Sequence, residues 1–213
     1  MPQDIAPAGL PAQARRWLMP LLVAVWIGGC AAGLWILWDW DNRPGVSAQA
    51  RAQWPADSAL GRERGRPTLV MLVHPQCTCS RASLSELAEL LARATPRPKT
   101  FVLFLKPAAF ADGWEQTALW RTAAGLPGVT VIRDVEGREA ARFGAATSGQ
   151  TFLYDARGGL LFSGGITGAR AHAGDNAGRQ AVVTLLNGTG GPAAPRTSVF
   201  GCSLFDRGGR RTF

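Results

Sequence analysis

One uncharged run of 22 residues, 17–38, constrains this 213-residue chain more than any other feature. A helix rises 1.5 Å per residue, so the run is long enough to cross the hydrocarbon core of a membrane, about 30 Å thick. Arg15 and Arg16 precede the run, whereas Asp39 and Asp41 follow it. Because positive charge stays on the cytoplasmic side, the sequence predicts a single-pass protein of the bacterial cytoplasmic membrane with its N-terminus inside.

Two other interpretations of this run stay open. A cleaved signal peptide usually has a shorter apolar region and a small-residue cleavage site, which does not stand out here. The segment Ile27-Gly28-Gly29-Cys30 resembles a bacterial lipoprotein box with Cys30 as the lipidated residue, although the sequence after it stays apolar. All three interpretations place the rest of the chain in the periplasm or an equivalent extracytoplasmic space.

The sequence on either side of the run divides into four parts. Residues 1–16 are rich in Pro, Ala and Gln and are predicted to be a disordered cytoplasmic segment. Residues 39–67 are predicted to be a linker, 68–187 a folded domain, and 188–213 a Gly/Pro/Thr-rich tail. An apolar patch around Cys202 predicts that this tail folds back onto the domain.

Strands and helices are predicted to alternate through 68–187. The predicted strands are 69–73, 100–105, 129–133, 151–155 and 159–163, and the predicted helices are 80–94, 113–125 and 176–186. This alternation is typical of a layered α/β domain with a central sheet. The last two strands form a hairpin, which adds an antiparallel edge and makes the sheet mixed.

The charge of the chain argues against one class of function. Positive charge exceeds negative charge by eight, but the arginines are scattered among acidic residues and glycines. A nucleic-acid-binding surface needs clustered positive charge, so no nucleic acid partner is expected. No Gly-rich fingerprint follows a strand and opens a helix, so no organic cofactor is expected either.

Two cysteines, Cys77 and Cys79, stand where the predicted strand 69–73 gives way to the helix 80–94. The first amide groups of a helix carry partial positive charge, which stabilises a thiolate and lowers the pKa of its thiol. A disulfide between the two would close a small, strained ring, and strain makes a disulfide easier to reduce. The pair predicts a redox centre in which Cys77, expected to be the more exposed thiol, attacks a partner's sulfur and Cys79 resolves the mixed disulfide.

Three further residues are candidates for the same site. Cys202 could reduce or trap the pair, form a structural bridge to it, or be a buried thiol without a role. His74 lies three residues before Cys77 and could tune its thiolate or bind a metal, and His172 could line the site from a Gly-rich stretch. For both histidines an ordinary packing or surface position is the simpler interpretation.

With its elements in this order, the chain resembles the thioredoxin fold in its extracytoplasmic TlpA-like form, which has an extra helix and strand before the final hairpin. The resemblance covers about residues 65–187 and rests on the strand into the cysteine pair and on 131–144 and 151–158. More narrowly, membrane-anchored proteins labelled RedB are similar at 74–83, 163–168, 174–179 and 199–202. The resemblance implies a thioredoxin-like sheet flanked by helices, and a thiol-disulfide oxidoreductase whose partners are protein thiols or disulfides.

The chain departs from the family pattern at two positions. The family pair is C-x-x-C, and aligning Cys77 with its first cysteine puts Ser80 at the second. The family also has a cis-proline just before the strand that here begins near Thr151, whereas this chain has Ser148-Gly149-Gln150. In the family that proline shapes the partner groove and helps keep metal away from the cysteines, so its absence strengthens a metal-binding alternative.

The sequence therefore predicts an extracytoplasmic thiol-disulfide oxidoreductase, anchored in the membrane by one helix and acting through Cys77, Cys79 and Cys202. The alternative is a non-catalytic Cu(I)-binding or metal-delivery protein that uses the same cysteines, because thiolates close together select Cu(I). A thioredoxin-fold interaction module without turnover is a third possibility.

Overall fold

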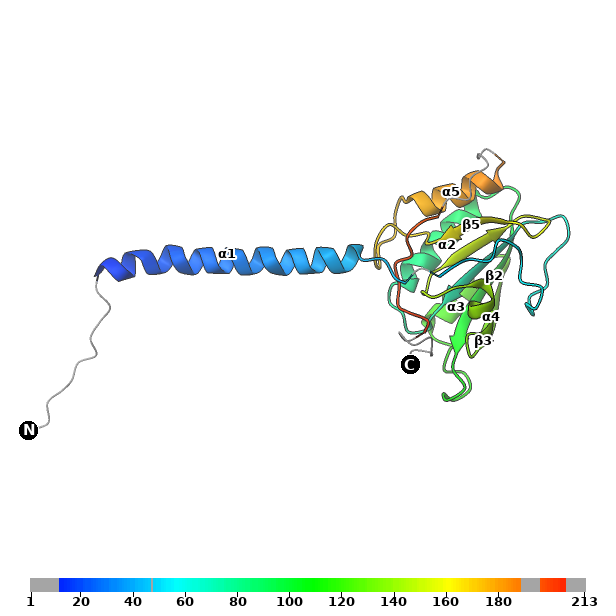
Figure 1. Ribbon diagram of the computed structural model, residues 1–213, viewed down its shortest axis with the longest axis horizontal. Helices are drawn as coiled ribbons and strands as arrows, with labels where there is room; N and C mark the ends of the chain where they lie inside the picture. Colours follow the sequence, from blue (N-terminus) through cyan, green and yellow to red (C-terminus); the bar gives the residue numbers. More distant parts are fainter. Residues whose placement is uncertain (1–11, 47, 189–195, 206–213) are drawn as a thin grey trace, which may run out of the picture. The chain divides into compact units, whose positions relative to one another are not determined.

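The computed structural model describes residues 12–46, 48–188 and 196–205, and it divides into two compact units, Met1–Asp41 and Asn42–Phe213. The first unit is one helix, α1 (Ala12–Asn42) (Figure 1). Its segment Arg15–Asn42 is long and apolar enough to cross a membrane, and none of it is buried. The helix extends past both ends of the predicted span and starts inside the segment predicted to be disordered, of which 1–11 lie outside the described residues.

The second unit is built on a mixed five-stranded sheet. Its strands are β1 (Thr68–Val73), β2 (Lys99–Lys106), β3 (Val129–Val135), β4 (Thr151–Tyr154) and β5 (Leu160–Gly164), in the spatial order β3-β2-β1-β4-β5. The first three strands are parallel, whereas β4 runs antiparallel to β1 and pairs with β5 as a hairpin. The helices are α2 (Ser80–Arg93), α3 (Ala118–Ala124), α4 (Arg138–Phe143) and α5 (Ala177–Leu186). The mixed α/β sheet predicted from the alternation is confirmed.

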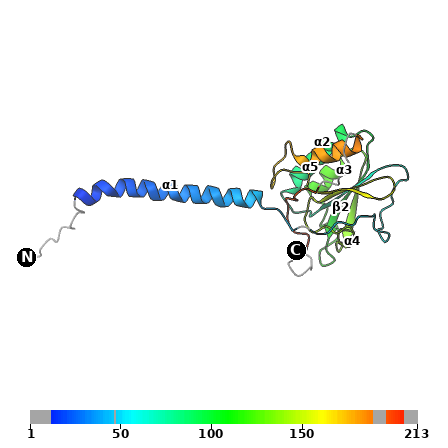
Figure 2. The same cartoon turned by 45° about the horizontal axis from the view of Figure 1, so that its top comes forward.

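The central strand β1 is apolar throughout because it is covered on both faces. Successive side chains of a strand point to opposite faces. Leu69 and Met71 pack in one core with residues of α2, α3 and α5. Val70 and Leu72 pack in a second core with Phe143 of α4 and with the aromatic residues of β4. Figure 2 shows α2, α3 and α5 on one side of the sheet and α4 on the other. This packing fixes the end of β1, from which the cysteine segment departs.

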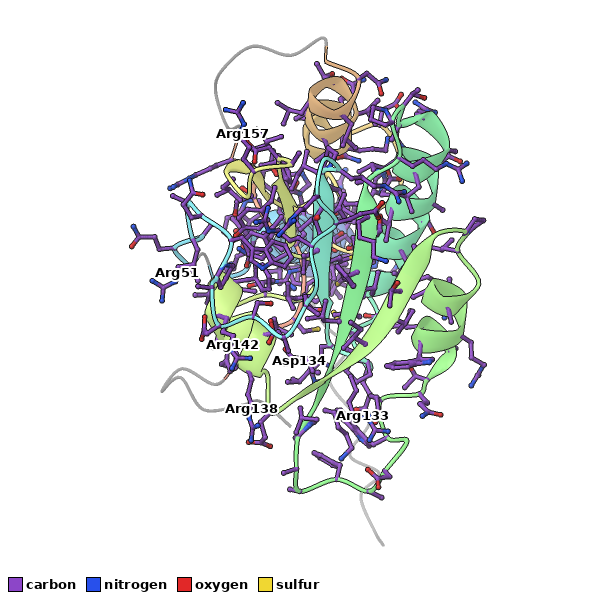
Figure 3. All side chains as sticks on the ribbon, turned by 90° about the vertical axis from the view of Figure 1, so that its right-hand side faces the viewer. Arg51, Arg133, Asp134, Arg138, Arg142 and Arg157 are labelled. Carbon is purple, nitrogen blue, oxygen red and sulfur yellow. The ribbon has the colours of Figure 1, made fainter. Side chains whose placement is uncertain are left out.

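Two elements differ from the sequence prediction around β3. The helix predicted from residue 113 begins only at Ala118. Gly113 has a left-handed φ of 84°, a conformation that a regular right-handed helix does not contain. The short helix α4 is not among the predicted helices. The carboxylate of Asp134, at the end of β3 and labelled in Figure 3, accepts the N–H groups of Glu139 and Ala140 at 2.9 and 3.0 Å. These two bonds satisfy amides that the first turn of a helix leaves unpaired.

The segment predicted to be a linker belongs to the folded domain after Asn42. The ring of Trp54 contacts the rings of Phe143 and Tyr154 edge-on, with centroids 5.0 and 5.3 Å apart. The Trp54 amide donates to the carbonyl of Gly158 at 2.8 Å. Residues 48–54 contain no helix. The reason for the difference is long-range packing of one aromatic side chain, which no local pattern in 39–67 encodes.

The described part of the tail, 196–205, lies against the domain, as its apolar patch predicts (red in Figure 1). Ser203 forms an antiparallel bridge with Thr147, and Arg196 forms a parallel bridge with Ser163. Leu204 is 1% exposed and packs in the second core. The tail is thereby attached to the loop that precedes β4.

Candidate functional site

The cysteine pair lies where β1 ends and α2 begins, the junction predicted from the sequence. After β1 the chain makes a turn in which the Cys77 amide donates to the carbonyl of His74 at 3.0 Å. The Ser80 amide in turn donates to the carbonyl of Cys77 at 3.1 Å. Cys79 is the N-cap residue of α2 and has helical dihedrals, φ −63° and ψ −28°. Cys77 therefore lies in the turn that leads into α2, and Cys79 caps the helix.

The burial of the cysteines is the reverse of the sequence expectation. Cys77, expected to be the more exposed thiol, is 0% exposed, and Cys79 is 3% exposed. Cys202 is the exposed cysteine of the domain. The physical reason is the tail, which folds over Cys77 and presents Cys202 to it. The expectation that Cys77 stands open to a partner at the end of the strand is therefore wrong for this conformation.

Cys77 and Cys202 are in direct contact although 125 positions separate them in the chain. The backbone N–H of Cys202 donates to Cys77 Sγ at 3.3 Å. The Cys202 thiol and Ser80 lie beside the same sulfur, where they can donate to it. Cys77 Sγ is thus an acceptor surrounded by donors, which favours its charged form.

The ionisation of these two thiols follows from that arrangement. Hydrogen bonds, first of all the one from the Cys202 thiol, lower the pKa of Cys77 to about 4, although burial opposes this change. The pKa of Cys202 is raised, first because its proton is held in the bond to Cys77, and also because of burial and the negative charge nearby. The two shifts have opposite directions, so Cys77 is the more acidic thiol of the pair. Cys77 is the thiolate of the pair and Cys202 is the thiol.

Cys79 has a different environment from Cys77. Burial, followed by the charge of Cys77, raises the pKa of Cys79, whereas the amide of Ala171 and the guanidinium of Arg170 oppose this rise. Cys79 therefore lies against the loop before α5 and is a weaker nucleophile than Cys77 at neutral pH.

Two functional candidates escaped the sequence reasoning. Ser148 Oγ accepts the His74 amide at 2.7 Å and lies 2.7 Å from Ser80 Oγ, so it ties the loop before β4 to the cysteine turn. Arg170 donates to the carbonyl of Gly201 at 2.9 Å and stands near Cys79 and Cys202. The signal for Ser148 was its place where the family has proline. No local signal distinguishes Arg170 from the other scattered arginines.

The two histidines do not add a metal ligand set. His74 is 8% exposed, its Nδ1 accepts the Gln76 amide at 3.2 Å, and its ring contacts Trp114 edge-on. His172 is exposed and lies in a turn closed by its own amide. Among residues 12–46, 48–188 and 196–205, no group of three or more His, Cys, Asp or Glu is placed to hold a metal ion. Cys77 and Cys202 remain as a pair of soft ligands.

A groove of about 320 Å³ opens beside the cysteine turn. Its walls are the turn from Pro75 to Thr78, Arg81 on α2, and the residues 117–119 at the start of α3. Most of its surface is apolar, so it could receive an apolar side chain of a partner polypeptide next to Cys77.

We expect the Cys77 thiolate to persist to acid pH, because its pKa is lowered to about 4. In a Cys30→Ser background of the full chain, the ultraviolet absorbance of one thiolate should already be present at about pH 6, well below the ordinary thiol pKa near 8.5. It should disappear as the pH falls through about 4. Cys202→Ala should move the transition upward. A thiolate signal that appears only above about pH 8 would contradict this ionisation.

Together, the fold and the site define a class of protein. A central strand leads into cysteines at the N-terminus of a helix, helices cover both faces of a mixed sheet, and an antiparallel hairpin completes it. This is the thioredoxin-like fold. No family model matches the sequence, and no curated protein matches it.

Several solved structures are similar to this chain. An uncharacterised conserved protein from Geobacillus kaustophilus is 18% identical, with a TM-score of 0.53, over 76% of this chain and 91% of its own. A hypothetical protein from Sinorhizobium meliloti 1021 is 22% identical, with a TM-score of 0.48, over 76% of this chain and 93% of its own. A secreted disulfide oxidoreductase of Mycobacterium tuberculosis is 18% identical, with a TM-score of 0.35, over 46% of this chain and 67% of its own. The likeness concerns the fold alone.

Proposed function

We propose that this chain is an extracytoplasmic thiol-disulfide oxidoreductase, anchored in the membrane by α1, in which Cys77 is the attacking thiolate. One observation carries the proposal: Cys77 accepts a hydrogen bond at the N-terminus of α2, and a second thiol lies beside its sulfur. A stabilised thiolate next to a thiol is what disulfide exchange requires. Arg15 and Arg16, near the start of α1, and Asp39 and Asp41, near its end, support the extracytoplasmic placement.

The reaction would run in two exchanges. The Cys77 thiolate attacks one sulfur of a partner's disulfide, which forms a mixed disulfide and releases the other sulfur as a thiolate. A second thiol of this chain, Cys79 or Cys202, then attacks Cys77 Sγ and releases the partner's remaining sulfur. The partner gains two electrons and takes up two protons, while this chain becomes oxidised. The reverse sequence would oxidise a dithiol partner.

The departures from the family pattern fit this chemistry. Ser80 stands at the second position of the C-x-x-C pattern, and its hydroxyl and amide stabilise the Cys77 thiolate. Ser148 stands before β4 and links that loop to Ser80 and His74. Serine hydroxyls at both places supply hydrogen bonds but no third soft ligand, which favours exchange over metal delivery.

The proposal is tested by a redox titration of the full chain in detergent, in a Cys30→Ser background. The chain is equilibrated across a series of glutathione ratios, its thiols are trapped in acid, and the alkyl groups added are counted by mass spectrometry. We expect two thiols per chain to oxidise in one transition with a two-electron slope, about 30 mV per tenfold change. If no thiol oxidises at any ratio while the same chain binds Cu(I) tightly, the metal alternative is right and the proposal is wrong.

A further inference from the structure

The tail segment 199–205, which we call the strap, brings Cys202 onto Cys77. Building on the proposed function, we propose that the strap supplies the resolving thiol, so that the disulfide formed during the reaction joins Cys77 to Cys202. Cys79 then has no part in the disulfide. The pair is thus made of residues 125 positions apart in the chain, and the C-x-C spacing does not define it.

The strap is attached to the loop before β4 by an isolated antiparallel β-bridge. The Ser148 amide donates to the Cys202 carbonyl at 2.8 Å, and the Leu204 amide donates to the Ala146 carbonyl at 2.8 Å. Thr147 and Ser203 form the antiparallel bridge between these bonds. Two segments paired antiparallel in this way are held in one register by their main-chain hydrogen bonds. The register fixes Cys202 above the cysteine turn.

The part of the strap next to Cys202 is held against the domain by a close backbone contact and by one arginine. A Cβ atom at Gly201 would lie 2.0 Å from the Ser148 carbonyl oxygen, so only glycine allows this approach. The Gly201 carbonyl accepts a hydrogen bond from Arg170 at 2.9 Å. The Val199 carbonyl accepts the Gly45 amide at 2.8 Å. Arg170 is therefore a positioning residue that joins the loop before α5 to the strap.

Cys202 is better placed than Cys79 to reach Cys77. Its amide nitrogen lies 3.3 Å from Cys77 Sγ, and its thiol lies beside that sulfur. A disulfide needs Cβ atoms roughly 3.8 Å apart. Cys79 is the N-cap of α2, and a Cys77–Cys79 bridge would close a small, strained ring at the start of that helix. Such a ring would strain the turn that is closed by the bond from the Ser80 amide to the Cys77 carbonyl.

Burial gives the strap a second role. Because Cys77 is 0% exposed, a partner disulfide reaches it only when the strap moves away from the loop before β4. The mixed disulfide then forms between Cys77 and the partner. When the strap returns, the Cys202 thiol loses its proton, attacks Cys77 Sγ and forms the Cys77–Cys202 bond. The partner's sulfur leaves as a thiolate and takes up that proton.

Disulfide mapping of the full chain tests this assignment. The Cys30→Ser chain and its Cys79→Ser variant are oxidised with glutathione disulfide, quenched in acid and digested with trypsin. We expect both to yield one crosslinked pair, joining the peptide that contains Cys77 to the peptide that contains Cys202. In Cys202→Ser, the glutathione adduct on Cys77 should persist at least about tenfold longer, because the intramolecular thiol is lost.

Gly201→Ala tests the strap with all three site thiols in place. The new methyl group should displace the strap and slow resolution of the glutathione adduct at least about tenfold. Gly61→Ala is the matched control, because a Cβ there meets no atom within 4 Å, and it should resolve the adduct at the unchanged rate. A Gly201→Ala chain that resolves as fast as Gly61→Ala would contradict the strap.

The possible outcomes separate this inference from the proposed function. A Cys77–Cys79 disulfide, with resolution unaffected by Cys202→Ser, would overturn the strap and leave the oxidoreductase intact. Failure of Cys77 to form any disulfide, with glutathione or within the chain, would overturn both. Cys202→Ser replaces only one sulfur atom with oxygen, in an exposed residue. It therefore decides whether Cys202 is the resolving thiol even if Gly201→Ala folds poorly.

Discussion

Replacing Cys77 with serine abolishes disulfide exchange, with turnover falling at least about a thousandfold. Serine cannot form the mixed disulfide, and its hydroxyl is not ionised at neutral pH. Cys79 is a poor substitute nucleophile, because burial raises its pKa. The bond to Cys77, which raises the pKa of Cys202 in the intact site, is lost in this variant, but burial still raises that pKa, so Cys202 is a poor substitute as well. The measurement is the initial rate at which the full chain, with dithiothreitol as reductant, reduces a fluorescent peptide disulfide.

Cys30→Ser is the matched control for this loss. Cys30 lies in α1 and is exposed there. We expect its turnover to stay within about twofold of the unmodified chain, as is usual for substitutions away from a site. If Cys77→Ser retained more than about a tenth of the rate, another cysteine would be the attacking thiol.

Replacing Arg179 with alanine should lower the free energy of unfolding by about 3–5 kcal/mol. Arg179 and Glu86 are 4% and 2% exposed, and Arg179 Nη1 donates to Glu86 Oε2 at 2.6 Å. The Glu86 carboxylate also accepts the Gly174 amide at 2.7 Å and Asn176 Nδ2 at 3.0 Å. Without Arg179 a buried carboxylate loses its cation. The pair joins α2 to α5 and to the loop that carries Arg170.

Urea denaturation of the full chain, followed by circular dichroism, measures this change. Arg93→Ala is the control, because the Arg93–Glu89 ion pair spans 3.4 Å with both side chains more than half exposed, at 56% and 57%. Exposed pairs of this kind are worth about 1 kcal/mol or less. If the two variants lost similar stability, water or another group would stabilise the Glu86 charge without Arg179, and the buried-pair interpretation would be wrong.

The sequence predicted the framework of the domain because that framework depends on local patterns. The apolar run of β1, the helical spacing of leucines in α2 and the hairpin signal after Asp155 each set an element without knowledge of its neighbours. The position of Cys77 and Cys79 at the N-terminus of α2 follows from the same patterns. Their chemistry could therefore be anticipated before their surroundings were known.

The surroundings of Cys77 could not be predicted, because they depend on contacts between distant segments. The Cys202 amide reaches Cys77 from 125 positions away, and the fit depends on the absence of a side chain at Gly201. Likewise, Trp54 joins the domain through Phe143 and Tyr154, and the short helix α4 depends on the Asp134 carboxylate. A pattern within one window does not carry such pairings.

Capture of a mixed disulfide tests the central claim, exchange through the Cys77 thiolate, most directly. The full chain carrying Cys30→Ser, Cys79→Ser and Cys202→Ser retains Cys77 alone, with no second thiol to resolve the adduct. Incubated with a peptide disulfide near neutral pH and quenched in acid, it should gain one peptide per chain, attached to Cys77 and released by dithiothreitol. If Cys77 stays unmodified in the folded chain, while the urea-unfolded chain reacts at the same residue, Cys77 does not exchange disulfides and the proposed function is wrong.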